Sequence, residues 1–145
     1  IDFTTDTLDA VLAAAGFRRD AQTFFICEGV THYLPAQAVD VLFRYIGQSA
    51  AGSRLVFTYI HRGMLDGSAP FAGAADTLAT VRRAGEPYTF GFEPTELSPY
   101  LAKRNLSLVE DVGADAYRER YLTPRGRGAE PLSEYQRAAL ASVGT

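Results

Sequence analysis

The chain has 145 residues, of which 47% are hydrophobic, and its formal net charge at pH 7 is −3. That is enough for one domain with a hydrophobic core, spanning 1–145. Without a basic stripe the chain is not expected to bind nucleic acid, and no stretch reaches the roughly 18 apolar residues of a membrane span. The single cysteine, Cys27, excludes an internal disulfide and fits a reducing, cytoplasmic location.

The first part of the chain predicts alternating helices and strands. Apolar residues at helical spacing predict a helix within 4–15, and an apolar run predicts a strand over 23–27 that is covered on both sides. Pro35 opens a second helix, and another apolar run predicts a strand over 55–60. The connection between the two strands is long enough for a right-handed parallel pair.

The second part is less regular. Glycine and proline recur between 62 and 93, where only 74–83 predicts a short helix. A further helix is expected over 94–104. The remaining residues predict a strand over 106–112, an antiparallel or edge strand over 116–122 because its side chains alternate, and a terminal helix over 134–142.

Polar side chains stand where the two predicted parallel strands end. Glu28 follows the first strand directly, and Tyr59 and His61 come at the end of the second. Ligands of open α/β sheets bind at the carboxyl ends of the strands, so these three residues are expected at a ligand-binding rim. A buried carboxylate is costly, so Glu28 must be hydrated, paired or bound to a ligand; a helix cap or a surface salt bridge is the plain alternative.

Several other chemistries find little support. Cys27, His32 and His61 are the only soft or imidazole ligands, and they lack the spacing of a zinc site, so no metal is expected. A cysteine inside an apolar strand is usually inert, and no G-x-S-x-G nucleophile motif is present. Gly126 and Gly128 do not form a dinucleotide or phosphate loop.

Several short motifs occur along the chain in a characteristic order: Ile1-Asp2-Phe3, Ala14-Ala15-Gly16-Phe17, Glu28-Gly29-Val30, Tyr33-Leu34, Gly52-Ser53-Arg54-Leu55-Val56-Phe57 with Ala51 in place of a proline, Gly85-Glu86-Pro87 and Phe90-Gly91. With these motifs, and with the segment from Asp20 to Tyr59 at its centre, the chain resembles the leucine carboxyl methyltransferase-like family, whose bacterial members are S-adenosylmethionine-dependent O-methyltransferases. The resemblance implies an α/β fold: the C-terminal half of a class I Rossmann-like sheet, with parallel strands, an antiparallel edge pair at 106–111 and 117–122, and helices on both faces.

The resemblance also implies a set of site residues. Asp2 and Phe3 match a dipeptide that contacts the adenine of the donor, and Glu28, with Gly29, matches the acid that approaches its ribose or methionine part. The acceptor side is expected to be lined by Thr31, His32, Tyr33, Tyr59 and His61. Of these, His32 and Tyr33 are the catalytic candidates, because a hydroxyl acceptor needs a base whereas a carboxylate does not.

The glycine-rich donor loop of the family is absent, so the chain is interpreted as a partial methyltransferase domain that is inactive alone. Its exposed sheet edge is expected to pair with a missing N-terminal half or with another copy of the chain. The predicted function is O- or carboxyl-methyl transfer from S-adenosylmethionine to a small-molecule acceptor, with 62–93 as an acceptor-side insertion. The alternative is a non-catalytic α/β domain or a self-associating remnant.

Overall fold

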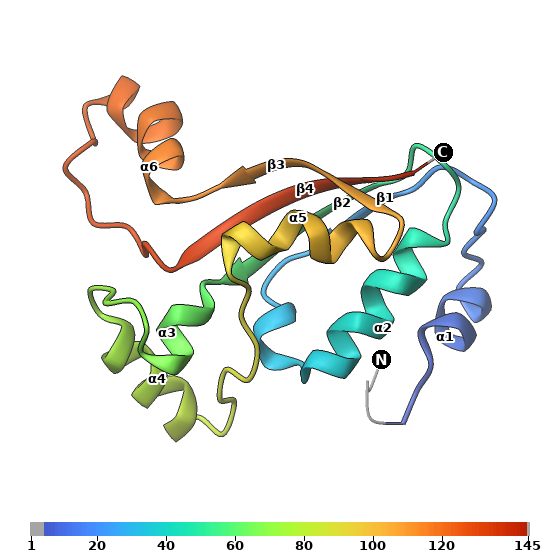
Figure 1. Ribbon diagram of the computed structural model, residues 1–145, viewed down its shortest axis with the longest axis horizontal. Helices are drawn as coiled ribbons and strands as arrows, with labels where there is room; N and C mark the ends of the chain where they lie inside the picture. Colours follow the sequence, from blue (N-terminus) through green and yellow to red (C-terminus); the bar gives the residue numbers. More distant parts are fainter. Residues whose placement is uncertain (1–4, 145) are drawn as a thin grey trace.

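A mixed four-stranded sheet runs through the centre of the computed structural model, which describes residues 5–144 (Figure 1). The strands lie in the order β1 (Phe24–Cys27), β2 (Arg54–Ile60), β4 (Gln136–Val143) and β3 (Leu106–Val112). β1 and β2 are parallel, and β4 is antiparallel to both of its neighbours. The predicted α/β class and parallel pair are therefore confirmed.

The helices are mostly those that the sequence predicts. α1 (Leu8–Ala14), α2 (Ala36–Gly47), α4 (Ala74–Arg83) and α5 (Pro94–Ala102) lie within or close to the expected ranges. Two short helices, α3 (Arg62–Asp66) and α6 (Ala114–Tyr117), were not expected. Short 3₁₀ turns cover Thr31–Tyr33 and Thr123–Arg125, and a π turn covers Arg118–Leu122.

The predicted edge strand over 116–122 is wrong. These residues form α6 and the π turn that follows it. The alternation of tyrosine and arginine left neither face apolar enough to bury, whereas a helix brings Tyr117 and Tyr121 together with their ring centroids 5.0 Å apart. The antiparallel edge pair exists, but its second member is β4.

The predicted terminal helix over 134–142 is also wrong, because this stretch forms β4 in the middle of the sheet. A central strand makes backbone hydrogen bonds on both sides, which outweigh the helix preference of alanine. Ala139 and Ala141 are fully buried, and their small side chains leave room for the helices packed on the sheet.

The main core lies between the sheet and the helices α2 and α5. Leu55 and Phe57 of β2 point into it, together with Phe43 of α2 and Leu97 and Leu101 of α5. Each of these side chains is completely buried. The rings of Phe43 and Phe57 meet edge to face, with centroids 4.9 Å apart. Burial on this scale is the main source of stability in the fold.

The opposite face of the sheet is open within residues 5–144. Phe24 and Ile26 point to this face and are 58% and 69% exposed. In Figure 1, α1, α2 and α5 all lie on the same side of the strands. The predictions of a first strand covered on both sides and of helices on both faces are therefore not met in the described residues, because the only helices that pack on the strands cover one face.

The ends of α2 and α5 meet at a close backbone approach. A methyl group on Gly47 would overlap the carbonyl oxygen of Arg104, so glycine is required there. The Arg104 guanidinium pairs with Asp40 of α2, and it lies over the ring of Tyr100 at 3.4 Å from the centroid. The Asn105 side chain donates to the Gly47 carbonyl at 2.9 Å. These contacts fix the two core helices to each other.

Residues 62–93 make an excursion that leaves the sheet and returns to the same point. The Arg62 amide donates to the Phe92 carbonyl at 2.8 Å, and the Phe92 amide donates to the Ile60 carbonyl at 3.0 Å. Within the excursion, α3 and α4 pack on a small second core of Ile60, Met64 and Tyr135. In Figure 1 both helices lie beyond the end of β2.

Candidate functional site

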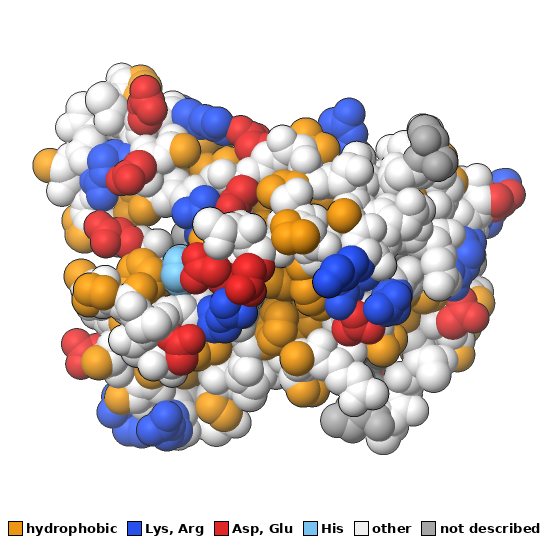
Figure 2. All heavy atoms as spheres, in the orientation of Figure 1, with side chains coloured by type: hydrophobic (Ala, Val, Ile, Leu, Met, Phe, Trp, Pro, Cys, Tyr) orange, Lys and Arg blue, Asp and Glu red, His pale blue; other side chains and the backbone are white. Residues whose placement is uncertain are grey.

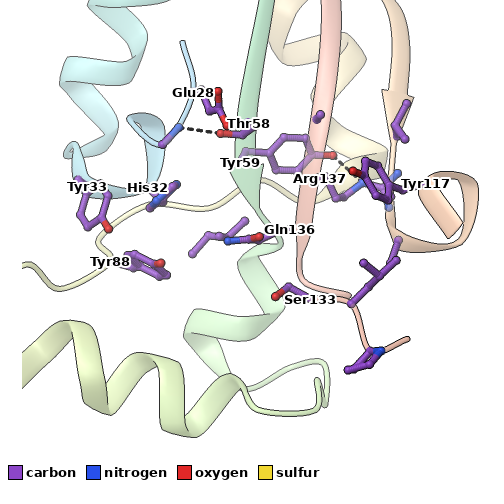
Figure 3. Close-up of a pocket in the computed structure, with 18 residues that line it drawn as sticks. Glu28, His32, Tyr33, Thr58, Tyr59, Tyr88, Tyr117, Ser133, Gln136 and Arg137 are labelled. Atoms are coloured by element: carbon purple, nitrogen blue, oxygen red, sulfur yellow. Dashed lines mark hydrogen bonds between the residues drawn. The ribbon is translucent and has the colours of Figure 1, made fainter. Parts of the chain in front are cut away.

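A cleft of about 660 Å³ lies where β1 and β2 end and β4 begins (Figure 3). Residues from several distant segments line it: Glu28, Gly29, His32, Tyr33, Thr58, Tyr59, Ile60, Tyr88, Val112, Gly113, Ala114, Tyr117, Pro131, Leu132, Ser133, Gln136, Arg137 and Ala138. Its volume is in the range of small-molecule sites, and its position at the carboxyl ends of parallel strands is where α/β folds bind ligands.

Glu28 stands at the mouth of this cleft and is exposed. Gly29 follows in the left-handed backbone region, with φ of 69°, and its amide donates to the Thr58 hydroxyl at 2.8 Å. This turn holds the chain against β2 and leaves the Glu28 carboxylate without a hydrogen-bond or ion-pair partner among residues 5–144. The helix-cap and salt-bridge alternatives are therefore not seen in this range.

Thr31 does not line the cleft. It is completely buried, and its hydroxyl donates to the Thr58 carbonyl at 2.9 Å. Thr58 thus receives contacts from both sides of the turn, through its hydroxyl from Gly29 and through its carbonyl from Thr31. The structure gives Thr31 a role in anchoring the turn that carries His32 and Tyr33.

Three rings form a cluster at one end of the cleft. His32 lies 4.5 Å from both Tyr33 and Tyr88, and the two tyrosines are 5.2 Å apart in an edge-to-face arrangement, all measured between ring centroids. Tyr88 is brought there by the excursion, because the Thr89 amide donates to the His32 carbonyl at 2.7 Å. Burial first, and the neighbouring Tyr33 hydroxyl second, raise the pKa of Tyr88 to about 12.

His32 is only 6% exposed, and burial lowers its pKa below the usual value. Its Nδ1 atom is enclosed and has no hydrogen-bond partner. An imidazolium ion needs partners for two N–H groups, so this environment favours the neutral ring. An unpaired acceptor is more easily tolerated than an unpaired donor, which favours the tautomer with the proton on Nε2.

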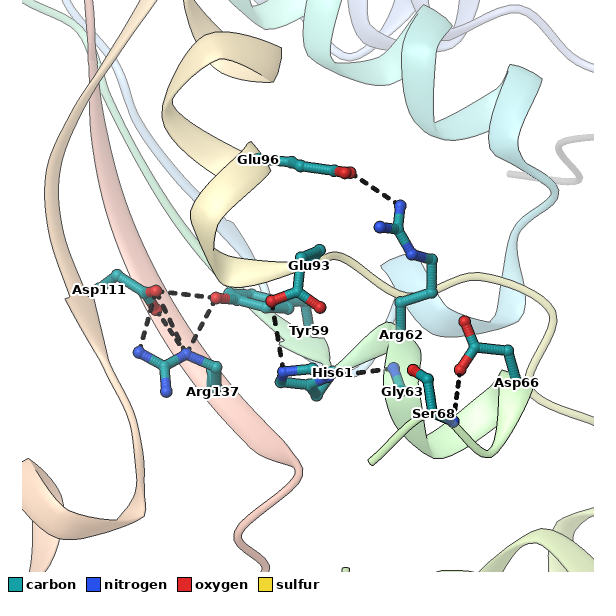
Figure 4. A network of polar contacts seen from close by, with 10 residues as sticks. All are labelled: Tyr59, His61, Arg62, Gly63, Asp66, Ser68, Glu93, Glu96, Asp111 and Arg137. Carbon is teal, nitrogen blue, oxygen red and sulfur yellow. Dashed lines mark hydrogen bonds and ion pairs between the residues drawn. The ribbon is translucent and has the colours of Figure 1, made fainter. Parts of the chain in front are cut away.

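Tyr59 belongs to a partly buried polar network beside the opposite end of the cleft (Figures 3 and 4). Its hydroxyl donates to Asp111 at 2.8 Å and accepts from Arg137 Nε at 3.0 Å. Arg137 also donates to Asp111 through Nη2 at 3.0 Å. Burial, followed by the hydrogen bond to Asp111, raises the pKa of Tyr59, so it is a neutral phenol at physiological pH.

His61 lies apart from this cleft. Its Nδ1 caps α3 (Arg62–Asp66) by accepting from the Gly63 amide at 3.0 Å, and its Nε2 is 3.6 Å from Glu93. Figure 4 shows this arrangement next to the Arg62–Glu96 ion pair. The structure therefore separates His61 from the other predicted acceptor-side residues, while it brings His32, Tyr33 and Tyr59 to one cleft.

Several lining residues escaped the sequence analysis. Tyr88 lies in the predicted acceptor-side insertion but was not singled out, Tyr117 comes from a predicted edge strand, and Arg137 comes from a predicted helix. Had the stretch around Arg137 been interpreted as a strand, Arg137 would have been placed at a strand end, facing the rim. Asp2 and Phe3 lie outside the described residues, so the structure gives no position for them.

Three further observations concern metal binding, membrane-spanning helices and surface charge. Within residues 5–144, no group of three or more His, Cys, Asp or Glu residues is arranged to hold a metal ion. None of the described helices is both long and apolar enough to cross a membrane. Acidic and basic side chains are interspersed on the face shown in Figure 2, without a continuous basic area.

The N-terminal third of the chain, residues 1–47, matches the sequence profile of the leucine carboxyl methyltransferase family. A Streptomyces coelicolor protein, provisionally named an S-adenosyl-L-methionine-dependent methyltransferase, is 45% identical over 58 residues. This match covers 39% of the chain and 20% of the relative, so the chain spans about a fifth of that protein. The resemblance to the family is thereby confirmed.

Solved structures show the same fold. A DUF574 family protein from Streptomyces avermitilis has a TM-score of 0.63 at 14% identity, covering 96% of this chain and 53% of that one. Magnesium protoporphyrin IX methyltransferase from Synechocystis, solved with bound S-adenosylhomocysteine, has a TM-score of 0.50 at 12% identity, covering 90% and 48%. The chain thus has the fold of about half of each of these structures.

Proposed function

We propose, from the relationship of this chain to the leucine carboxyl methyltransferase family, that the cleft is part of an S-adenosylmethionine-dependent methyltransferase site. The observation that carries the proposal is the position of the cleft at the carboxyl ends of the parallel strands β1 and β2. When bound, S-adenosylmethionine supplies a methyl group that is already activated on a sulfonium centre.

The residues present fit one side of such a donor. Glu28 offers an exposed carboxylate, without a partner in the described chain, that can accept hydrogen bonds from hydroxyl or ammonium groups. The tight turn at Gly29 keeps this carboxylate at the strand end, through the hydrogen bond to Thr58. Glu28 and Gly29 are therefore the proposed donor contacts.

The proposed acceptor atom is a carboxylate oxygen. A base that takes a proton from a hydroxyl would have to become an imidazolium, yet His32 is buried and its Nδ1 has no partner to stabilise that ion. A carboxylate needs no base, and the neutral ring can still donate from Nε2. Arg137 lines the cleft and engages Asp111 and Tyr59 only through Nε and Nη2 in the described structure, so Nη1 is available to an anionic oxygen.

A hydroxyl acceptor is the second candidate, because His32 is one of only two residues whose ordinary pKa lies near neutrality. The two candidates differ in the effect of His32→Asn on the transfer of a labelled methyl group by the complete enzyme. A carboxylate acceptor predicts a loss below about threefold and a flat profile between pH 6 and 8. A loss of about a hundredfold, together with a vanished pH dependence, would establish His32 as the base.

The proposal is tested by calorimetric titration of S-adenosylhomocysteine into the chain. We expect saturable binding that Glu28→Ala weakens by about tenfold, equivalent to one charge-assisted hydrogen bond. Glu119→Ala is the matched control, since Glu119 is an exposed acid outside the cleft. Binding that is insensitive to Glu28, or no binding at all, would favour the non-catalytic α/β domain instead.

We also propose that further methyltransferase chain covers the free edge of β1 and the open face of the sheet. In the described residues β1 pairs only with β2, and Phe24 and Ile26 stay exposed beside it. The related structures are about twice as long as the part that this chain matches. An exposed apolar strand edge of this kind associates with other chains when it is left uncovered, so self-association is the competing outcome.

A further inference from the structure

Aromatic side chains stand at both ends of the cleft. His32, Tyr33 and Tyr88 are grouped at one end, and Tyr117 lies near Arg137 at the other (Figure 3). Tyr117 is supported from behind by Tyr121, whose ring centroid is 5.0 Å away. The two ends come from four separate segments of the chain, so the arrangement is a product of the tertiary fold.

Two of these rings, Tyr33 and Tyr117, are not buried as core aromatics are. Tyr33 is 39% exposed and Tyr117 is 47% exposed, whereas Tyr59 at the floor of the same cleft is almost fully buried. Each of these two rings packs against another ring on one side and faces the cleft on the other. The packing restricts the conformational freedom of the ring, but part of its apolar surface remains exposed. The available ring surface is suited to stacking against a flat, apolar ligand.

The ring contacts also hold the geometry in place. Tyr33 and Tyr88 meet edge to face at an interplanar angle of 75°, and Tyr88 meets His32 at 72°. The hydrogen bonds from Thr89 to His32 and to Leu34 tie the two segments together next to the rings. A preformed wall of this kind recognises a ligand with little further ordering.

We propose that the acceptor is a planar aromatic acid, whose ring system stacks on Tyr33 at one end of the cleft or on Tyr117 at the other. This inference rests on the proposed carboxylate methyl transfer, and it adds the class of molecule that carries the carboxylate. A cleft of about 660 Å³ admits a two-ring or three-ring compound. The stacking surface selects for flatness, whereas aliphatic acids of the same charge and size gain only apolar burial.

The experiment compares two probes of equal charge and similar size, 2-naphthoate and trans-decalin-2-carboxylate, in calorimetric titrations into the chain. We expect 2-naphthoate to bind at least about threefold more tightly, which is what one aromatic contact contributes. Equal affinities, or no measurable binding of 2-naphthoate, would overturn the inference.

Variants show whether the rings are responsible. Tyr33→Leu and Tyr117→Leu are expected to weaken 2-naphthoate binding about threefold to tenfold, and to leave the decalin acid within twofold. Tyr33→Phe should retain binding because the ring is kept. Phe24→Leu is the matched control, since Phe24 is an exposed ring that neither lines the cleft nor contacts its aromatic residues.

The outcome is separable from that of the proposed function. S-adenosylhomocysteine binding that depends on Glu28, combined with equal binding of the two acids, leaves methyl transfer standing and removes the aromatic acceptor. Ring-dependent binding of 2-naphthoate without S-adenosylhomocysteine binding supports the aromatic site and counts against the methyltransferase. If both leucine variants leave 2-naphthoate binding unchanged, the rings are not the recognition surface.

Discussion

The two faces of the sheet differ sharply, although the same four strands build both. On the covered face, Leu55 and Phe57 are completely buried beneath α2 and α5. On the open face, Phe24 and Ile26 are more exposed than buried. The open face also carries large apolar side chains, so their presence alone does not distinguish the face that stabilises this chain from the face that is available to another.

This difference assigns separate tasks to alternate residues of one strand. In β1, Phe25 packs against the main core while its neighbour Ile26 projects into solvent. A substitution in this strand therefore affects folding when its side chain points to the core, and association when its side chain points to the open face. The expected effects below follow from this division, starting with the largest.

Phe57→Ala should be the most damaging change, with a loss of about 3–5 kcal/mol in the free energy of unfolding, because it removes a ring from a site that cannot collapse. Urea unfolding followed by circular dichroism measures it. Ile26→Ala, on the open face, should cost less than about 1 kcal/mol. Similar losses at the two positions would show that the open face is covered in solution. If Phe57→Ala does not fold, Phe57→Leu should give a smaller loss of about 1–1.5 kcal/mol.

Gly47→Ala should cost about 1–3 kcal/mol, because its methyl group meets the backbone carbonyl of Arg104, which can move only with the end of α5. Thermal unfolding of the variant measures the loss. Gln37→Ala, at an exposed position in the same helix, should change stability by less than about 0.5 kcal/mol. A Gly47→Ala protein as stable as the parent would mean that the contact between α2 and α5 is loose.

Tyr59→Phe should cost about 1 kcal/mol, since it removes one hydroxyl from the partly buried network and leaves Asp111 and Arg137 paired with each other. Asp111→Asn should cost more, because it leaves the Arg137 guanidinium without its counter-ion. A double-mutant cycle in urea separates the two contributions. Additive losses would contradict a coupled network.

His32 should give stability a pH dependence. Burial lowers its pKa in the folded chain from an ordinary 6.5, so the unfolded chain binds the proton more strongly. Its contribution is fully present above pH 6.5 and is lost as the pH falls from there through the folded pKa. Urea unfolding at intervals between pH 5 and 8 measures this, and His32→Asn should flatten the curve in that window. If the variant keeps the same dependence of unfolding free energy on pH, a group other than His32 is responsible.

Phe24→Thr combined with Ile26→Thr should have the smallest effect on folding, within about 1 kcal/mol, because both side chains are already in solvent. The same change should reduce self-association, measured by sedimentation velocity over a range of concentrations. Phe24 and Ile26 would have no part in association if the sedimentation profile of the double variant matched that of the parent.

Local signals predicted the first half of the chain well. Pro35 marks the start of α2, and the apolar runs mark β1 and β2, because each of these elements is specified by residues next to one another. Predictions for the second half were wrong where tertiary contacts determine the secondary structure. The alanines of β4 favour a helix in isolation, and only pairing with β2 and β3 on both sides makes them a strand.

The site divides in the same way. Glu28 and Tyr59 could be placed at a rim from the sequence, since they stand at the ends of predicted strands. Gly29, His32 and Tyr33 were added by the family resemblance. The hydrogen bond from the Thr89 amide to the His32 carbonyl brings Tyr88 to His32 across more than fifty residues, and Asp111 reaches Tyr59 across 52. His61 was assigned to the acceptor side from its place after β2, but the helix that begins there turns it towards Glu93.

The excursion over 62–93 departs and returns between Ile60 and Phe92, which are hydrogen-bonded to each other. A segment whose two ends are hydrogen-bonded to each other in this way can vary independently of the sheet. Its length and content can change by insertion, deletion or grafting while the strands on either side keep their register, because the cost of closing a longer loop rises only slowly. The ring that Tyr88 contributes belongs to this segment, so one wall of the cleft can be exchanged as a unit without rebuilding the sheet.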